Sequence, residues 1–421
     1  MRVRGVASLA AMVAIAVTGA ACGGSDSTTD STTGSTAPPP VASGDTGATP
    51  PPVTAEVLGG AMPTSLGAGE GALSIVVWPG YAEDGSVDKN YNWVGPFQQE
   101  TGCTVTSKVA ATSDEMVQLM HTGQYDGVSA SGNASTRLIL AGDAAPVNVD
   151  LIKNYTALSE FLKDQPYNSY QGTHYGIPHG WGANLLMWRP DKVTPDPDSW
   201  SVVFDPNSPS KGKVTAYDDP IYIADAAKYL KATQPDLGIT DVYELDDKQF
   251  QAAVDLLKQQ RTIIGQYWND YTKDIAAYAA GDSVLGSGWQ IIANLINIDP
   301  KNPPVKAIVP KEGSTGWSDT WMVYSKAQHP NCMYMWMDFI TRPEIQSSVA
   351  QWFGEAPANP AACDQIVKAD ATFCDTFHAK DEAFYKSVDF WKVPLPDCGD
   401  SRGQTCKGYD AWLQAWQEIK G

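Results

Sequence analysis

A carboxylate stands between aromatic residues in the stretch Gly316-Trp317-Ser318-Asp319-Thr320-Trp321. A Trp face attracts a cation by roughly 0.5 to 2 kcal/mol, and a nearby Asp adds a charge-assisted hydrogen bond of about 1.5 to 3 kcal/mol. The pattern therefore suits a cationic guest. The alternative is structural, with Trp317 and Trp321 as core aromatics and Asp319 as a residue at a strand edge.

Two further aromatic groups follow apolar runs that are typical of buried strands. Leu73 to Val77 ends at Trp78-Pro79-Gly80-Tyr81, and a run from Val284 to Gly286 leads to Gly288-Trp289. Open α/β sheets bind ligands at the carboxyl ends of their strands. We therefore expect these aromatic residues at a cleft, with core packing as the alternative for each ring.

The sequence contains no motif that would indicate an enzyme or a metal site. It has no Gly-x-Ser-x-Gly elbow, no His-Glu-x-x-His pair and no phosphate-binding loop ending in Lys and Ser or Thr. His174 and His179 are separated by a Gly and a Pro and offer no common metal-binding face. Adjacent acidic residues such as Asp218 and Asp219 would point to opposite faces of a strand or cap a helix. We therefore expect a non-enzymatic protein without a cofactor or a metal.

Composition and charge are those of a globular protein that avoids nucleic acid. The chain has 421 residues, 43% of them hydrophobic and 10% aromatic, which is enough for two or three domains with their own cores. Its 29 basic and 48 acidic residues give a formal charge of -19. This charge repels nucleic acid and anionic membrane surfaces and mildly favours cationic ligands.

Residues 1–21 have the form of a secretory signal peptide. A basic start is followed by an apolar run from Val6 to Val17, which is too short for a comfortable membrane span. The segment from Gly19 to Cys22 resembles the processing site of bacterial lipoproteins, in which the Cys becomes the lipidated first residue, although Leu is usual where Gly19 stands. Simple cleavage and release is the alternative. Residues 22–72, rich in Ser, Thr, Gly, Ala and Pro, predict a disordered tether behind a lipidated Cys22.

Six cysteines remain after Cys22, and an even number in an exported protein indicates three disulfides: Cys103, Cys332, Cys363, Cys374, Cys398 and Cys406. There is no Cys-x-x-Cys pair, so a zinc site is not expected. Several pairings are possible. The short separations favour pairing the third with the fourth and the fifth with the sixth, which leaves the first two for each other.

Short strands and helices alternate along the body of the chain, which implies βαβ units and a mainly parallel sheet of the α/β class. The first block has predicted strands at 73–77, 104–109 and 125–130 and helices at 94–100 and 113–123. The second has strands at 213–217 and 284–286 and helices at 224–232 and 247–260. A crossing strand from His174 to Gly182 leads into the apolar run from Leu185 to Trp188.

Because the chain returns to the first block after the second, the sequence predicts two lobes with a ligand cleft between them. We expect lobe 1 to comprise residues 73–180 and 315–360. Lobe 2 would comprise residues 181–314 and 361–421.

A series of short motifs runs through residues 73 to 362: Trp78-x-x-Tyr81, Gln98 to Gly102, Tyr125 to Val128, Gly212 to Asp219, Gly288-Trp289, Pro310 to Gly313 and Trp317-Ser318-Asp319. In this order the series resembles the bacterial periplasmic polyamine-binding proteins, the spermidine/putrescine-binding components of ABC transporters. The resemblance implies a two-lobed periplasmic-binding-protein fold of type II and permease subunits of an ABC transporter as partners.

In that family a polyamine lies extended in the cleft, with rings along its methylene groups and carboxylates at its ammonium groups. Rings bury methylene groups at about 0.8 kcal/mol each, and carboxylates satisfy amines that are costly to desolvate. Carried over by position, the contacts would be Trp78, Tyr81, Trp289, Trp317, Asp219 and Asp319. Asp219 could equally cap the helix that follows. Asn133 stands where the family often has an aromatic residue and is a further candidate.

Two residues depart from the family pattern and are candidate ligand contacts as well. Tyr222 stands where Glu is common, and Glu355 stands near the position of an aromatic residue in spermidine binders. A loop glutamate is more often solvated. If Glu355 instead faces the cleft, it replaces the carboxylate missing at Tyr222 and changes the spacing of amines that the site accepts.

The sequence therefore predicts a monomeric substrate-binding lipoprotein of an ABC importer, anchored to the outer face of the cytoplasmic membrane by its lipid only. Its partners would be a small cationic ligand, with a polyamine as the first choice, and the permease subunits. A quaternary ammonium or another small solute is the runner-up, and a ligand-free adhesive or structural lipoprotein is a third class. The identity and affinity of the ligand do not follow from the sequence.

Overall fold

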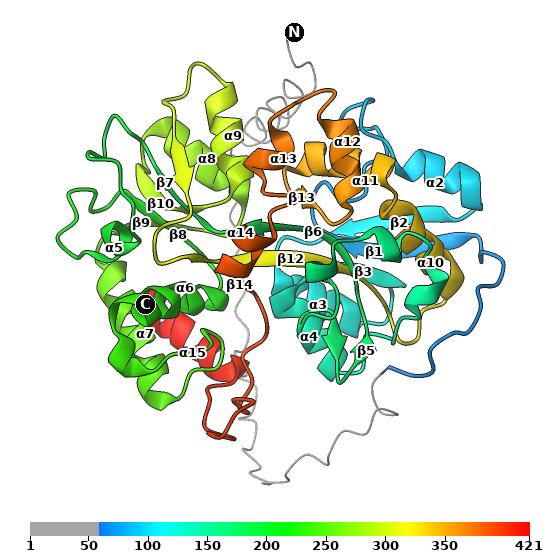
Figure 1. Ribbon diagram of the computed structural model, residues 1–421, viewed down its shortest axis with the longest axis horizontal. Helices are drawn as coiled ribbons and strands as arrows, with labels where there is room; N and C mark the ends of the chain where they lie inside the picture. The colour runs from blue at the N-terminus through cyan, green and yellow to red at the C-terminus, as the bar shows by residue number, and fades with distance from the viewer. Residues whose placement is uncertain (1–58) are drawn as a thin grey trace, which may run out of the picture.

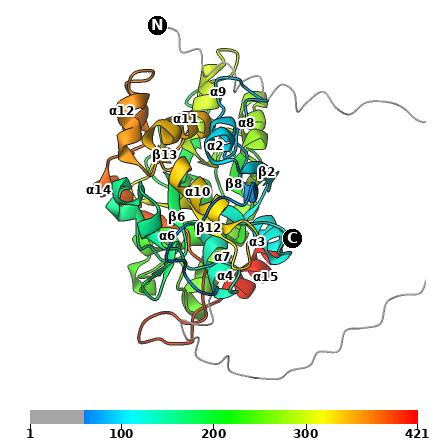
Figure 2. The same cartoon turned by 90° about the vertical axis from the view of Figure 1, so that its right-hand side faces the viewer.

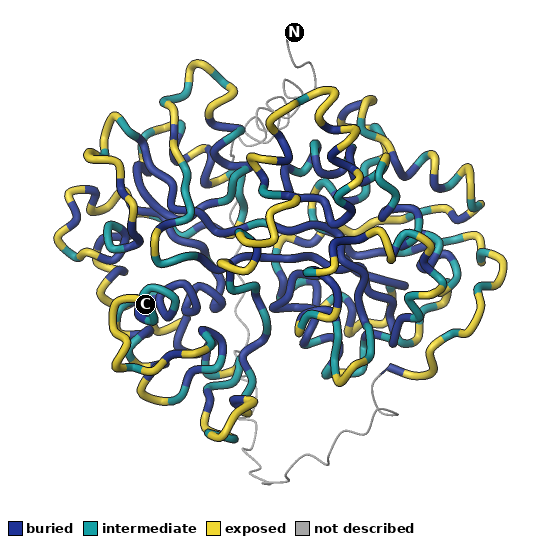
Figure 3. The backbone as a smooth tube through the Cα atoms, in the orientation of Figure 1, coloured by how far each residue is buried: buried dark blue, intermediate teal, exposed yellow. Residues whose placement is uncertain are grey.

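A computed structural model describes residues 59–421, which form two lobes with one principal β-sheet in each (Figure 1). The predicted signal peptide, Cys22 and most of the predicted tether lie outside the described residues. Buried backbone follows the strands of both sheets, and exposed segments lie mainly at the periphery (Figure 3). Within the described residues, no helix is long and apolar enough to cross a membrane.

The first sheet contains seven strands: β1 (Ala72–Val77), β2 (Thr104–Val109), β3 (Gly127–Ser131), β6 (Ile177–Ala183), β12 (Ser314–Val323), β13 (Ala356–Pro357) and β14 (Val388–Phe390). Their order is β13-β6-β12-β3-β1-β2, with β14 paired to β12. As predicted, β1 is parallel to β2 and β3, because helices α2 (Val94–Thr101) and α3 (Ser113–His121) carry the chain back between them. By contrast, β12 is antiparallel to β3 and β6.

Local sequence signals account for the ends of the early helices. Gly102 ends α2 in the left-handed conformation, at φ 73°, which a glycine adopts at no steric cost. The cap of α3 is Thr112, whose hydroxyl accepts from the amide of Glu115. Helix α4 (Gly132–Leu140) follows β3 directly, and β4 (Ser169–Tyr170) pairs with β5 (Thr173–His174).

The second sheet contains β7 (Leu185–Trp188), β8 (Val214–Tyr217), β9 (Ile264–Trp268), β10 (Leu285–Gly288) and β11 (Lys306–Ile308), in the order β11-β7-β10-β8-β9. Its helices are α5 (Ser201–Phe204), α6 (Ile223–Thr233), α7 (Asp247–Arg261), α8 (Tyr271–Ala280) and α9 (Gln290–Ile298). A capping box between Asp246 and Gln249 starts α7. The apolar face predicted for α7, with Phe250, Val254 and Leu257, is buried.

The chain crosses between the two sheets where β6 passes into β7 and where β11 leads into β12. Asn184, between β6 and β7, forms hydrogen bonds that connect the two crossings. Its amide N–H donates to the carbonyl of Thr315 at 2.9 Å, and its Nδ2 donates to Thr315 Oγ1 at 2.8 Å. All ten residues of β12 are buried, and the strand runs across the centre of the molecule (Figure 1).

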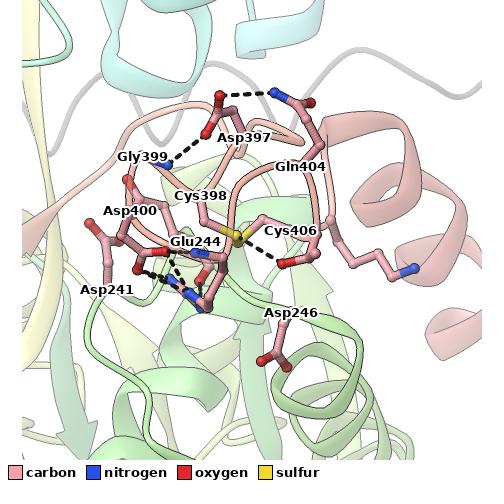
Figure 4. Close-up of a disulfide and its surroundings, with 12 residues drawn as sticks. Asp241, Glu244, Asp246, Asp397, Cys398, Gly399, Asp400, Gln404 and Cys406 are labelled. Atoms are coloured by element: carbon pink, nitrogen blue, oxygen red, sulfur yellow. Dashed lines mark hydrogen bonds and ion pairs between the residues drawn. A yellow bond between two sulfur atoms is a disulfide. The ribbon is translucent and has the colours of Figure 1, made fainter.

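The C-terminal part contains α10 (Pro330–Ile340), α11 (Pro343–Phe353), α12 (Cys363–Ile366), α13 (Phe373–Thr376), α14 (Glu382–Ser387) and α15 (Tyr409–Lys420). We expected residues 361–421 in lobe 2, but α12 packs on α11 (Figure 2), and β14 pairs with the first residues of β12 (Figure 1). The chain after β14 contacts the second lobe through Lys392, the disulfide-closed loop (Figure 4) and α15, which packs against α7. The lobe to which this part of the chain belongs is therefore set by the pairing of β14 with β12, a strand far away in the sequence, and not by its position after the second block.

The three disulfides have the predicted pairing. Cys103–Cys332 joins the start of β2 to α10, Cys363–Cys374 joins α12 to α13, and Cys398–Cys406 closes a loop before α15. The first bridge connects residues 229 positions apart and the last connects residues 8 positions apart.

Candidate ligand-binding site

A cavity of about 530 Å³ lies between the lobes. The first sheet contributes Trp78, directly after β1, Ser131 at the end of β3 and Asp319 in β12. The second lobe contributes Tyr217 at the end of β8 and Trp289 directly after β10. Strand ends of both sheets therefore meet at one cavity, where open α/β sheets generally place their ligands.

Aromatic rings line the cavity from both lobes and from the C-terminal segment: Trp78, Tyr217, Tyr271, Trp289, Trp317, Phe353 and Trp391. Trp289 and Trp317 meet edge to face with centroids 6.0 Å apart, and the centroid of Tyr217 lies 5.6 Å from that of Trp289. The indole N–H of Trp289 donates to Oδ1 of Asn184 at 2.9 Å, so the crossover residue holds this ring. Ring faces around one space can cover an apolar chain or face a cation.

Asp319 is the buried carboxyl of the cavity wall, with an exposed fraction of 2%. It lies opposite Ser131 of β3 and Gly180 of β6 in the sheet. Ser131 Oγ donates to Asp319 Oδ1, and the hydroxyl of Tyr81 donates to Asp319 Oδ2 at 2.6 Å. Burial raises the pKa of Asp319 to about 6, and the two hydrogen bonds oppose that rise. Both donors are neutral, so the charge of an ionised Asp319 is solvated but not neutralised.

Behind Asp319, the hydroxyl of Tyr81 also lies 2.9 Å from Oε2 of Glu355. A tyrosine hydroxyl has one proton and can donate to only one of the two carboxyls. Burial raises the pKa of Glu355 well above its usual range, and the charge of Asp319 raises it further. A protonated Glu355 therefore donates to the Tyr81 oxygen, and Tyr81 donates to Asp319.

Glu355 is neither in solvent nor on the cavity wall, so both positions considered from sequence are wrong. The exposed fraction of Glu355 is 1%. The next two residues form β13, which pairs with β6, and this pairing places Glu355 inside the first lobe. A Cβ on Gly180 would lie 2.3 Å from Cδ of Glu355, so glycine at this position leaves room for the carboxyl.

His179 completes the buried polar group as a neutral side chain. Trp321 Nε1 donates to His179 Nδ1 at 2.9 Å, which leaves the ring proton on Nε2. Nε2 lies 3.4 Å from Oε1 of Glu355, longer than the usual hydrogen bond, and has no hydrogen-bond partner within the described residues. Burial lowers the pKa of His179 to about 3. No charge from this histidine therefore reaches the cavity near neutral pH.

The more exposed part of the wall carries charges of both signs. Lys108 and Glu115 of the first lobe form an ion pair of 3.3 Å, with side chains 46% and 36% exposed. Asp270 of the second lobe accepts from the amide of Thr272 at 2.9 Å at the start of α8. With Asp319, the wall has three carboxyls and one amine, which favours a cation.

Of the other residues expected to contact a ligand, four lie off the cavity wall. Asn133 is buried in α4, where its Oδ1 accepts from Ser113 Oγ at 2.9 Å. Asp219 caps the short helix 220–222 by accepting from the amide of Ile221 at 2.9 Å, the capping role weighed above. Tyr222 packs in the core of the second lobe, where its hydroxyl accepts from Gln260 at 3.0 Å. Tyr81 is buried and reaches the cavity through Asp319.

Sequence reasoning missed several residues of the wall. Tyr217 and Ser131 stand at the ends of strands that were predicted, so the strand-end rule that selected Trp78 could have found them. Tyr271 and Phe353 lie on helices α8 and α11, and nothing local in the sequence distinguishes them from core aromatics. Trp391 lies in the segment that we assigned to lobe 2 without a site residue.

The sequence is similar to those of known bacterial binding proteins. Residues 92–374 match the sequence model of bacterial extracellular solute-binding proteins. The putrescine-binding periplasmic protein SpuD of Pseudomonas aeruginosa is 26% identical over 360 residues, 80% of this chain and 93% of that protein. The spermidine/putrescine-binding periplasmic protein of Escherichia coli is 25% identical over 304 residues, 69% of this chain and 83% of that protein.

Solved structures show the same fold. The spermidine/putrescine ABC transporter substrate-binding protein PotD of Streptococcus pneumoniae has a TM-score of 0.63 at 16% identity, covering 83% of this chain and 99% of that chain. At this identity the likeness concerns the fold alone. It confirms the predicted two-lobed architecture of the periplasmic-binding type.

Proposed function

Because the chain belongs to the family of bacterial extracellular solute-binding proteins, which serve ABC transporters and are not enzymes, we propose that it captures an organic cation of the polyamine class in the interlobe cavity. It then presents this ligand to the permease subunits of an ABC importer. The proposal is supported by relatives named for binding putrescine and spermidine.

The observation that carries the proposal is the state of Asp319. Its carboxyl is buried in the cavity wall, and its hydrogen-bond donors within the described residues are the neutral groups of Ser131 and Tyr81. An ammonium group at Asp319 would supply the missing positive charge and would favour the ionised carboxylate. The surrounding rings would bury the methylene groups of the ligand at about 0.8 kcal/mol each.

A second amine of the ligand would lie toward the exposed part of the wall. Asp270 and Glu115 are the carboxyls there, on opposite lobes. A ligand that contacts Asp319 and one of these two carboxyls would need an extended chain between its charges. Putrescine and spermidine have that form.

A quaternary ammonium ligand is the second candidate, and one observation favours it. Asp319 is the one acidic residue at the inner, buried part of the wall as described, whereas the aromatic rings around it are numerous. A quaternary ammonium has no N–H to donate and is held mainly by ring faces. It would use this arrangement with a single carboxylate.

Isothermal titration calorimetry with putrescine, spermidine and choline tests the proposal. We expect Asp319→Asn to weaken binding of the preferred probe about a hundredfold or more, because removing one partner of a buried charge pair costs about 3 to 5 kcal/mol. Asp255→Asn, which removes an exposed carboxyl from the surface of α7, is the matched control and should bind like the wild type. Equal binding by Asp319→Asn would refute the role of Asp319. Tighter binding of choline than of either amine would favour the second candidate.

We also propose that Cys22 is lipidated and holds the protein on the outer face of the cytoplasmic membrane, beside its permease. The Gly19 to Cys22 sequence motivates this proposal. The mass of the mature amino terminus tests it, since an unmodified Cys22 or a cleavage point elsewhere would contradict it.

A further inference from the structure

A buried hydrogen-bond network lies beside the two crossings that connect the lobes. It consists of Asn184, between β6 and β7, Thr315, the second residue of β12, and Asp225, in the first turn of α6. All three side chains are buried, and none of them lines the cavity between the lobes. The network therefore lies outside the wall that would contact a ligand.

The chemistry of the donors and acceptors gives every hydrogen bond in the network a direction. The indole of Trp289 can only donate, so Asn184 presents its side-chain oxygen to this ring, at 2.9 Å. The side-chain nitrogen of Asn184 then donates to Oγ1 of Thr315 at 2.8 Å. A carboxylate can only accept, so the hydroxyl proton of Thr315 points to Oδ1 of Asp225, at 3.0 Å. One chain of hydrogen bonds thus runs from the ring of Trp289 to the carboxyl of Asp225.

Asp225 is the last acceptor of this chain. Its Oδ2 has no hydrogen-bond partner within the described residues, and the side-chain nitrogen of Asn184 lies 3.5 Å from its Oδ1. Burial raises the pKa of Asp225 to about 7, and the hydrogen bonds from Thr315 and Asn184 oppose that rise. Oδ1 can accept the proton of Thr315 whether or not Oδ2 is protonated. The chain therefore keeps its direction in both protonation states.

The chain connects a ring of the cavity wall to the crossings. Trp289 follows β10 of the second lobe, whereas Asn184 and Thr315 belong to the two crossings, where the amide of Asn184 donates to the carbonyl of Thr315 at 2.9 Å. The ring of Trp289 also contacts two other rings, with centroids 4.9 Å from that of Trp268 and 6.0 Å from that of Trp317. Ring contacts tolerate a range of angles, whereas a hydrogen bond from the indole nitrogen restricts the plane of the ring.

We propose that Asn184, Thr315 and Asp225 are positioning residues, which hold the ring of Trp289 at one angle before a ligand binds. A ring that is already oriented loses little freedom on binding, and such preorganisation raises affinity without a new contact. The effect on affinity rests on the proposed function, because it needs a ligand that contacts this ring. The orientation of the ring does not depend on that function.

Nuclear magnetic resonance of the indole N–H groups tests the orientation of the ring without a ligand. The indole signal that is absent from Trp289→Phe belongs to Trp289. We expect Thr315→Val, which has a similar shape but no hydroxyl, to shift this signal and to speed its exchange with water roughly tenfold. Thr315→Ser keeps the hydroxyl and should leave the signal in place. Thr233→Val removes an exposed hydroxyl at the other end of α6 and is the matched control.

Calorimetry with putrescine, spermidine and choline tests whether this orientation contributes to binding. We expect Thr315→Val to weaken the preferred probe roughly fivefold, the factor that one buried hydrogen bond supplies, and Thr315→Ser to stay within about twofold of the wild type. In a Trp289→Phe background, Thr315→Val should cause no further loss, because Phe has no N–H for Asn184 to accept. A role in stability alone would give the same loss in both backgrounds.

Melting curves show whether each variant is folded. If Thr315→Val melts early, Asp225→Ala, which removes the last acceptor of the chain, replaces it with the same expected changes. An unchanged Trp289 signal would overturn the inference, whether or not a probe binds. A probe that the wild type binds, with no loss or with equal losses in both backgrounds, would also overturn it and leave the proposed function intact. If the wild type binds none of the three probes, the proposed function fails and the Trp289 signal alone decides the inference.

Discussion

Tyr81 has one hydroxyl proton and two carboxyl neighbours, and this proton count decides which buried acid can carry charge. Glu355 must supply the proton of its own hydrogen bond, whereas Asp319 accepts from Tyr81 and from Ser131. Asp319 is therefore the group that ionises near neutral pH, and Glu355 positions it through Tyr81. A carboxylate that has two fixed donors presents its remaining lone pairs to the cavity in one orientation.

Cation binding should consequently weaken as the pH falls through about 6. Burial raises the pKa of unliganded Asp319 to about 6, so the protonated form predominates below that pH and must lose its proton before it pairs with an ammonium. At pH 5 about one-tenth of the carboxyl is ionised, and the apparent dissociation constant should be about tenfold larger than at pH 7. Titrations between pH 5 and pH 8 measure this dependence.

The Glu355→Gln variant identifies the titrating group. The Gln side chain can still donate to the Tyr81 oxygen. The substitution leaves Asp319 as the one carboxyl bonded to Tyr81 in the described structure. The pH dependence should therefore persist in this variant. If it disappears, Glu355 controls the binding and our assignment of the charge to Asp319 is incorrect.

Among the elements, strand β12 follows the crossing from the second lobe, pairs within the first sheet and carries Asp319 of the cavity wall. Its first residues pair with β14 and with the end of β6, and its later residues pair with β3. Asp319 stands where the pairing with β6 shifts register, between Asp319 and Thr320. The position of this carboxyl therefore depends on three strands at once.

The bridge Cys103–Cys332 should contribute more to stability than the bridge Cys398–Cys406. It joins β2 to α10 over 229 positions, whereas the second bridge spans 8. Loop-closure entropy predicts about 5 kcal/mol for the long loop against about 2.5 kcal/mol for the short one. Replacing both cysteines of each pair by Ala and comparing denaturation midpoints measures the difference. A larger loss for the short loop would show that its contacts, and not chain entropy, determine the contribution.

At the scale of the whole described structure, residues 59–421, several carboxyls are buried and form no ion pair with a basic side chain. Burial raises the pKa of Asp219 and Asp225 to about 7, that of Asp274 to about 8 and that of Asp319 to about 6. In the unfolded chain such groups titrate near 4. The folded state therefore binds more protons between about pH 4 and pH 8, and its stability decreases as the pH rises through this range.

The unliganded protein should accordingly melt at a higher temperature at pH 5.5 than at pH 8. The stabilising contribution of these carboxyls is complete below their unfolded pKa and is lost as the pH rises through the folded values. Thermal unfolding followed by circular dichroism at both pH values measures the shift. Asp274→Asn removes the carboxyl with the highest of the four values and should reduce the difference. A melting temperature that is equal or higher at pH 8 would contradict this account.

Much of the fold follows from patterns that are local in the sequence. The strand predicted at 104–109 is β2 as observed, and the disulfide pairing expected from short separations is confirmed. Trp78 and Trp289 could be selected because a ring directly after a buried strand lies at a sheet edge. Local patterns missed β9 and α9. None of the three interior residues of β9 is fully buried, and α9 starts without a capping side chain.

Tertiary structure alone decided how the site is completed. Glu355 and Tyr81 are 274 positions apart, and only the pairing of β13 with β6 brings them into contact and out of solvent. Trp391 reaches Tyr217 because β14 joins β12 at the lobe boundary. The sequence by itself therefore determined the two-lobed fold and the residues at strand ends, since hydrophobic period and strand ends are local properties. Burial, protonation and the contacts of the C-terminal segment depend on neighbours distant in the chain, and no local pattern encodes them.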